Sequence, residues 1–130
     1  MMLFKKEKCL EDEELGILKA KTLIFATSSI KWKKRIDFLG FGFDVSVSGT
    51  LEKLNATERK IIVNALNDIA WLEKQVLEAI QELCLKNNVE FDAWEAYFRC
   101  SHIYVNKAEL YISINDMLNH LTYELELKWF

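Results

Sequence analysis

The middle of the chain has the pattern of a long amphipathic helix. Between residues 57 and 86, apolar side chains recur at spacings of three and four, which places them on one stripe of an α-helix. The stripe consists of Ile62, Leu66, Ile69, Leu72, Val76, Ile80 and Leu83. Asn55 can cap the start, with Glu58 in a capping-box relation, and Asn87-Asn88 can end the helix in a left-handed turn. The spacing therefore predicts one continuous helix over 57–86.

The C-terminal third alternates apolar and polar residues, the period-two pattern of strands with one buried face. The alternation is clearest over 121–129, and it predicts two further strands over 100–105 and 109–114. A two-residue turn at Asn106-Lys107 would join these two strands into a hairpin.

Strands are also predicted before the helix. Residues 32–38 and 43–47 alternate in the same way, and a tight turn at Gly40-Phe41 would join them, because glycine accepts a positive φ. Residues 15–25 supply one more strand, and residues 4–8 a further one.

These elements predict a single α+β domain over residues 1–130, in which a mostly antiparallel sheet of about six strands packs on one long α-helix. Hairpins come first, then the helix, then a three-strand meander. A helix of about thirty residues spans roughly 45 Å, whereas six strands make a sheet only about 25 to 30 Å wide. The helix must bend, overhang or be covered, and an apolar overhang favours a homodimer.

Composition and charge narrow the class of protein. The 130 residues are 51% hydrophobic and 28% charged, as in globular domains, so disorder is not expected. The formal net charge of −3 neither attracts nucleic acid nor indicates a binder of acidic lipids. Charged residues follow the first four positions at once, so neither a signal peptide nor a transmembrane helix is expected, which predicts a cytoplasmic protein.

No residue pattern in the sequence indicates a particular enzymatic reaction. Cys9, Cys84 and Cys100 are widely separated and odd in number, which suits neither a disulfide framework nor a Cys-x-x-Cys metal site. Glycine-rich nucleotide loops, His-Glu-x-x-His and Gly-x-Ser-x-Gly are absent from the sequence. No cofactor or metal is expected, although an active site assembled from scattered residues would leave no such trace.

Trp71 is the first candidate for partner binding. On a helical wheel it lies nearly opposite the apolar stripe, beside Lys60 and Lys74, so it is expected to be exposed. Exposed aromatic residues are enriched at interaction sites, which favours a partner or dimer surface there. The alternative is that the aromatic-rich segment 89–98 folds back and covers Trp71.

His102 is the second candidate. The predicted hairpin places it opposite Tyr111 and beside Tyr104, on the face away from the core, as a polar and aromatic binding patch. The alternative is a small hydrolase-like enzyme in which His102 is a general base, with Glu109 or Cys100 as its partner. The other histidine, His120, lies at a turn and needs no special role.

An acidic turn could steer a basic protein partner, or be simply solvated. Its residues are Glu11, Asp12, Glu13 and Glu14. Asp37 and Asp44 are predicted to face each other in the hairpin around Gly40, where two carboxylates could share a proton or a cation. Two aspartates offer too few oxygen ligands for a divalent ion, however.

The one basic cluster suggests a different alternative. Four cations surround Trp32: Lys31, Lys33, Lys34 and Arg35. Basic residues interleaved with an aromatic ring can bind a phosphate backbone and stack a base, so nucleic-acid binding through Lys31–Arg35 is a further alternative.

The order of elements also resembles a known group. The run 12–18 with its Leu-Gly step, then Trp32 leading into the strand 43–47, then a long helix and three strands, looks like a group of uncharacterised bacterial domain families. Some relatives in that group lie beside polymorphic toxins and are thought to be immunity proteins. The chain departs from the pattern in its long insert, 19–31. The resemblance implies a small cytoplasmic partner-binding protein without site residues, and together with the missing motifs it favours a non-enzymatic, immunity-type interaction protein.

Overall fold

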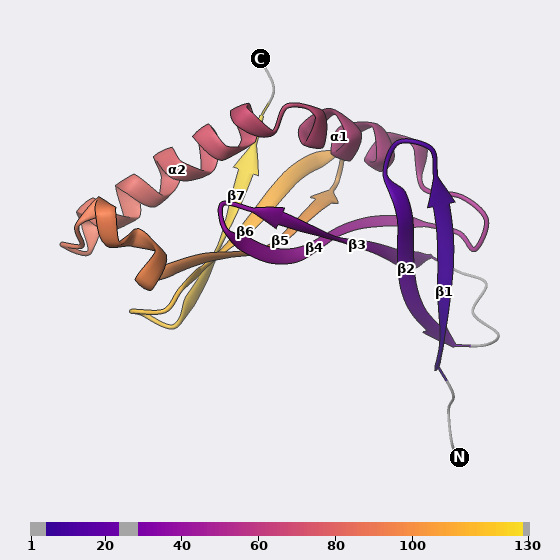
Figure 1. The fold of residues 1–130 in the computed structure, drawn as a ribbon, viewed down its shortest axis with the longest axis horizontal. Coiled ribbons are helices and arrows are strands. Elements are labelled where there is room, and N and C mark those ends of the chain that lie inside the picture. The colour runs from indigo at the N-terminus through magenta and orange to yellow at the C-terminus, as the bar shows by residue number, and fades with distance from the viewer. Residues whose placement is uncertain (1–4, 24–28, 129–130) are drawn as a thin grey trace.

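The computed structural model describes residues 5–23 and 29–128, and its strands form one seven-stranded sheet in which the spatial order follows the chain, β1 to β7 (Figure 1). The strands are β1 (Lys5–Asp12), β2 (Gly16–Leu23), β3 (Ile30–Phe38), β4 (Phe41–Gly49), β5 (Phe98–Asn106), β6 (Glu109–Asp116) and β7 (Leu121–Leu127). The helices are α1 (Ala56–Asn67), α2 (Ile69–Lys86) and the 3-10 helix η1 (Phe91–Ala96). The predicted strand ends at 4, 24–25 and 129 lie outside the described residues.

The prediction of about six strands on one long helix is wrong, because the sheet has seven strands and the helix is two shorter helices. The chain leaves the helical conformation at Asp68, where φ is −124° and ψ is 58°. The Asp68 carboxylate accepts a hydrogen bond from the backbone N–H of Trp71 and so caps α2. Asparagine and aspartate are poor helix formers because their side chains compete for backbone hydrogen bonds, and Asp68 does this in the middle of the predicted helix.

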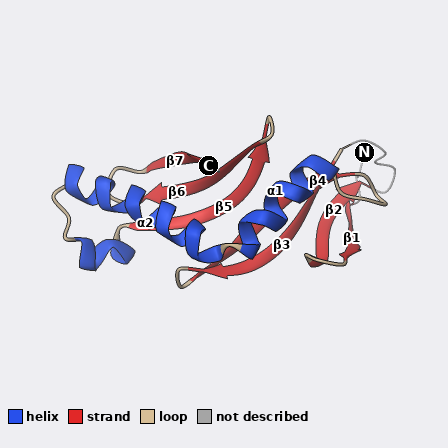
Figure 2. Cartoon of the chain, turned by 90° about the horizontal axis from the view of Figure 1, so that it is seen from above, coloured by secondary structure: helices blue, strands red, loops and turns tan. Residues whose placement is uncertain are grey.

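The break changes which residues the helices bury. Leu72, Val76 and Ile80 are fully buried, as the apolar stripe predicts, but Ile69 is 38% exposed. The predicted ends are right: the Asn55 side chain accepts from the N–H of Glu58, and Asn88 has a φ of 55°. Both helices lie over the same face of the sheet (Figure 2).

The sheet is mostly antiparallel, with one exception. β4 and β5 pair in parallel, with Asp44 opposite His102. The chain crosses over between them through α1, α2 and η1, and a parallel pair requires such a crossover. Strands from the two halves of the chain therefore meet at the centre of the sheet.

Both predicted hairpin registers are wrong by two residues. The turns are Leu39-Gly40 and Lys107-Ala108, and all four residues have positive φ, the conformation that suits the twist of a two-residue hairpin. A shift of two leaves every side chain on its predicted face, because side chains alternate with a period of two. It changes each residue's partner across the strand.

The new partners overturn two predicted pairs. Asp44 faces Arg35 rather than Asp37, so the two aspartates do not form a shared site. Tyr104, not His102, faces Tyr111.

The hairpin of β1 and β2 stands away from the rest of the sheet (Figure 1). Its two strands pair over their whole length, but among the described residues β2 pairs with β3 only at Lys19 opposite Lys33. The hairpin and the outer part of β3 consequently form a corner rather than a continuous surface.

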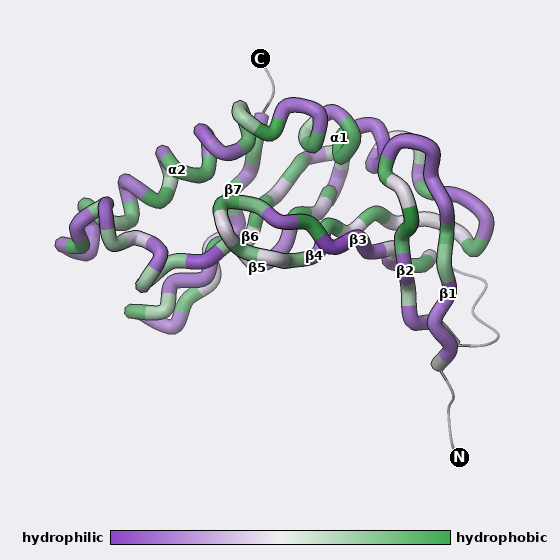
Figure 3. The backbone as a smooth tube through the Cα atoms, viewed as in Figure 1, coloured by the Kyte–Doolittle hydropathy of each residue, from purple (hydrophilic) through white to green (hydrophobic). Residues whose placement is uncertain are grey.

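The core lies between the helices and the sheet. Trp32 of β3 is fully buried there, and its Nε1 donates a 2.8 Å hydrogen bond to the carbonyl of Thr50. Apolar and polar residues are interspersed along the helices and the central strands (Figure 3), and the apolar residues of both form one buried cluster. No helix among the described residues combines the length and the apolar character needed to cross a membrane.

Candidate binding face

The face of the sheet opposite α1 and α2, here called the outer face, is not covered by either helix (Figure 1). Strand alternation decides what lies on it: in β4, Val45 and Val47 are buried toward the helices, while Asp44 and Ser46 project the other way. The outer face therefore presents the polar half of each strand.

Three rings form an aromatic stack on this face. His102 and Tyr104 are stacked with ring centroids 5.0 Å apart, and Tyr104 and Tyr111 with centroids 5.4 Å apart. All three side chains are half-buried. The structure thus brings together the three residues of the predicted polar and aromatic patch.

Hydrogen bonds hold the aromatic stack from both sides. Ser46 Oγ and His102 Nε2 lie 2.6 Å apart across the parallel pair of β4 and β5. On the other side, Glu124 accepts from Tyr104 Oη at 2.9 Å and from Ser113 Oγ at 2.7 Å. Burial, followed by this contact with Glu124, raises the pKa of Tyr104 to about 12, so the phenol stays protonated at neutral pH.

Sequence reasoning missed Ser46, Ser113 and Glu124. Glu124 occupies a polar position in the alternation of β7, which was the available signal. The two serines are 1% and 5% exposed, and nothing in the local sequence distinguishes them from serines on a solvated face.

The surroundings of His102 favour its neutral form. Burial lowers its pKa first, and the nearby charges of Lys31 and Lys33 lower it further, against smaller opposite effects of Glu124 and Asp44. A neutral imidazole can exchange a hydrogen bond with Ser46, with either group as donor.

The partners predicted for a catalytic His102 lie elsewhere. Glu109 faces Asn106 at the end of the hairpin. Cys100 is buried, which raises the pKa of its thiol to about 12 and leaves it protonated. Among the described residues, the side chain that hydrogen-bonds His102 is a serine, with no carboxylate to orient the ring.

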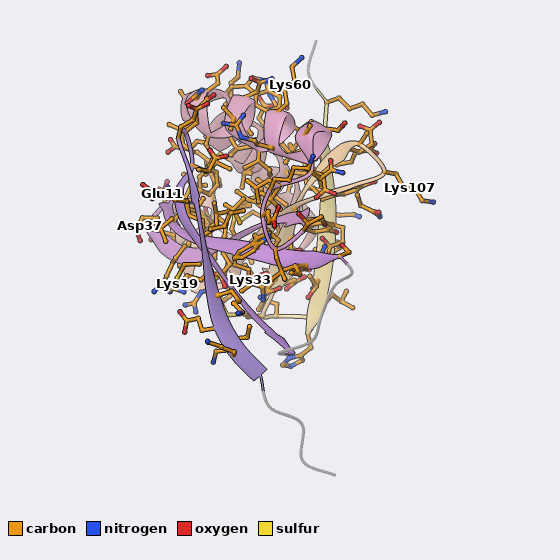
Figure 4. The ribbon with its side chains drawn as sticks, turned by 90° about the vertical axis from the view of Figure 1, so that its right-hand side faces the viewer. Glu11, Lys19, Lys33, Asp37, Lys60 and Lys107 are labelled. Atoms are coloured by element: carbon orange, nitrogen blue, oxygen red, sulfur yellow. The ribbon has the colours of Figure 1, made fainter. Side chains whose placement is uncertain are left out.

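A groove of about 610 Å³ lies in the corner between the β1–β2 hairpin and the outer side of β3. Its cations are Lys19, Lys21, Lys31, Lys33 and Arg35, and its carboxylates are Glu7 and Asp44. Lys19 and Lys33 project on the side of the sheet away from the helices (Figure 4). We call this site the basic groove.

The basic groove differs from the predicted cluster Lys31–Arg35. Trp32 is fully buried and cannot stack a base. Lys34 points to the other side of β3, where its Nζ donates to the carbonyl of Leu15. In place of Trp32 and Lys34, the groove contains Lys19 and Lys21 of β2. Only the fold shows that these two lysines lie beside β3.

Positive charge in the basic groove is incompletely neutralised. Lys19 lies directly opposite Lys33 and is 3.6 Å from Glu7. Within the described part of the chain, Lys31 and Lys33 take part in no ion pair. Like charges opposite each other destabilise a sheet, so this arrangement is not explained by stability.

Trp71 belongs to the other layer of the molecule. The sequence predicted an exposed Trp71, and this is wrong: it is half-buried on α2 and packs against the core. The segment after α2 folds back as η1, where Trp94 is buried and meets Phe41 edge-on at 5.9 Å. Because α2 lies on the face of the sheet opposite the outer face, Trp71 is remote from the aromatic stack, and the two predicted surfaces are not one site (Figure 1).

The acidic turn serves partly to hold the fold together. Asp12 is bound by Arg59 of α1 and accepts hydrogen bonds from the backbone of its own turn. Glu14 lies 3.4 Å from the same arginine. Glu11 and Glu13 are exposed and are the members of the turn left for a partner.

No metal centre emerges from the part of the chain that the structure describes, where no three His, Cys, Asp or Glu side chains gather as ligands. Comparison with protein-family profiles, with curated proteins and with solved structures finds no match for this chain.

Proposed function

We propose that this protein is a non-enzymatic binding protein that engages a protein partner across its outer face. The observation that carries the proposal is the aromatic stack of His102, Tyr104 and Tyr111, set on a face that no helix covers. Tyrosine and arginine are the residues that most often dominate binding energy at interfaces. The hydrogen bonds of His102 with Ser46 and of Tyr104 to Glu124 hold these two rings in place before a partner arrives, which lowers the entropy lost on binding.

The charges around the aromatic stack favour a protein over a simple polyanion. The basic groove lies on one side of it, and Glu124 and Glu126 of β7 lie on the other. A partner surface that carries both signs of charge complements this face, and such complementarity speeds association and excludes wrong partners.

Two other functions receive less support. A hydrolase centred on His102 would need a carboxylate or a reactive thiol beside the ring, and its contact is with Ser46. Nucleic acid could meet the basic groove, but Trp32, the ring that would have stacked a base, is buried.

The resemblance to immunity-type families gives the proposal a specific form, in which the protein is cytoplasmic and its partner is a toxin. A homodimer also stays a prediction, although the single overlong helix that favoured it is in fact two shorter helices. Co-expression with a toxin encoded beside this chain, scored by cell survival, tests the immunity role separately from binding.

Binding is tested by affinity capture with the whole chain as bait, in a lysate of the cells that encode it. We expect a specific protein to be retained by the wild type and lost with Tyr111→Ala, because this variant lacks the ring at one end of the aromatic stack. Lys60→Gln on α1 is the matched control and should retain the partner. A partner that Tyr111→Ala keeps and Lys60→Gln loses would move the binding surface to the helices and overturn the proposal.

A further inference from the structure

We propose that the basic groove binds an acidic segment of the protein partner in extended conformation, with carboxylates at alternate residues. This inference rests on the proposed function and specifies the chemistry of the partner. It concerns a different part of the outer face from the aromatic stack, so the two can be tested apart.

The first argument is the local charge. Of the described residues, five cations and two carboxylates line the basic groove of a chain whose net charge is −3. Lys19 and Lys33 are held directly opposite each other, and Lys31 adds a second unpaired cation on the same side of β3. Burial, followed by the charges of Lys31 and Lys33, lowers the pKa of His102 on β5, two strands away from β3. A negatively charged occupant relieves this repulsion, which an apolar or basic one does not.

The second argument is the spacing of the cations. Lys31, Lys33 and Arg35 occupy every second position of β3, so they project from the same side about 6.6 Å apart. An extended polypeptide repeats its side chains on one side at the same interval. Acidic residues at alternate positions would therefore meet successive cations, whereas a run of adjacent acidic residues would direct half of its carboxylates away.

The third argument selects a polypeptide over a nucleic acid. Proteins that bind single strands stack bases on accessible aromatic rings. Trp32 is buried on the helix side of β3, and none of the described residues that line the groove is aromatic. Beyond the groove lies the carboxylate of Glu124, which repels a phosphate chain that continues across the sheet.

The test is an NMR titration of the whole protein at low ionic strength with four probes. These are a peptide of alternating Glu and Thr, a peptide of the same composition with its Glu residues contiguous, a peptide with Gln in place of Glu, and a single-stranded oligothymidine of equal charge. We expect the alternating peptide to bind most tightly and to shift the amide signals of Lys31, Lys33 and Arg35. The Gln peptide should leave them unchanged.

The variant Lys31→Gln/Lys33→Gln/Arg35→Gln should weaken binding of the alternating peptide by at least about threefold and up to about a hundredfold, since each exposed ion pair contributes a factor of about 1.4 to 5. Lys60→Gln/Lys107→Gln, which removes two exposed lysines far from the groove, should leave it unchanged (Figure 4). Added salt should weaken binding in the wild type.

Three results would overturn the inference. Tighter binding of oligothymidine than of the alternating peptide would make the groove a nucleic-acid site. Equal affinity for the contiguous and alternating peptides, or no shift of the amide signals in the groove, would also contradict it. The triple variant is also used as bait in the affinity capture. If it retains the partner that Tyr111→Ala loses, the proposed function stands and the role of the basic groove is refuted.

Discussion

Arg59 of α1 holds the carboxylate of Asp12 through two hydrogen bonds, from Nε to Oδ2 at 2.6 Å and from Nη2 to Oδ1 at 3.1 Å. The same carboxylate accepts from the backbone N–H groups of Glu14 and Leu15, each at 2.9 Å. One side chain therefore closes the turn between β1 and β2 and ties that hairpin to the helix layer. The tie matters because, in the described parts of β2 and β3, the two strands pair at a single position.

Loss of this tie should loosen the hairpin. Asp12→Ala leaves two backbone N–H groups without their acceptor and leaves the Arg59 guanidinium with Glu14 alone, and we expect the free energy of unfolding in urea to fall by roughly 1–3 kcal/mol. Asp12→Asn keeps an acceptor for the turn and should cost less. Hydrogen exchange of β1 and β2 should rise in Asp12→Ala before that of β5 and β6. Equal protection in all four strands would show that the hairpin does not depend on Asp12.

The Asp12 contact also predicts a dependence of stability on acid. The hydrogen bond from Arg59 lowers the pKa of Asp12 from 3.8 to about 2, although burial opposes it. Because the folded pKa is the lower one, the stabilisation is fully present above pH 3.8 and is lost as the pH falls toward 2. As the pH falls over this window, the midpoint temperature of thermal unfolding should therefore drop more steeply for the wild type than for Asp12→Asn. Parallel curves would contradict the assignment.

His102 should destabilise the fold when it is protonated. Burial and the charges of Lys31 and Lys33 lower its pKa below the ordinary value of 6.5. The folded state thus prefers the neutral ring, and stability should decline as the pH falls through 6.5 toward the folded pKa. In an NMR titration of the ring protons, Lys33→Gln should raise the pKa of His102, and Lys107→Gln, a distant exposed lysine, should not. An unchanged titration in Lys33→Gln would place Lys33 away from the ring.

Removal of Lys33 should make the protein more stable. Lys33 lies directly opposite Lys19, and like charges in this position cost from a few tenths to about 1 kcal/mol. Lys33→Gln should raise the urea midpoint at low salt by a corresponding amount, and the gain should shrink at high salt because salt screens the repulsion. Lys107→Gln is the control. A less stable Lys33→Gln would mean that the lysine has a structural role.

Asp68 should be required for the start of α2. Asp68→Ala removes the side chain that accepts from the N–H of Trp71, and loss of such a cap costs about 0.5–2 kcal/mol. Asp68→Asn and Asp68→Ser, which can still cap, should be close to the wild type in urea denaturation. If alanine instead stabilised the protein, a continuous helix would be the preferred form and the break would not be set by Asp68.

The local sequence was sufficient to assign the faces of the residues in β5 and β6. Alternation in β5 and β6 places Ile103 toward the core and His102, Tyr104 and Tyr111 away from it, and this holds even though the register was wrong by two. The reason is that the side-chain period in a strand depends on the backbone of that strand alone. The ends of the helical region at Asn55 and Asn88 could be predicted for the same reason, because capping is local.

The tertiary structure decided which of those outward residues meet. Ser46 and His102 are 56 positions apart and touch because the helices carry the chain back to place β5 beside β4. Lys19 joins Lys33 only because the first hairpin docks at the edge of β3. Such contacts depend on strand pairing and on the packing of whole elements, and the pattern of apolar and polar residues along one strand contains no information about either. The sequence by itself therefore determined the polar character of the outer face, and the fold determined the aromatic stack and the basic groove on it.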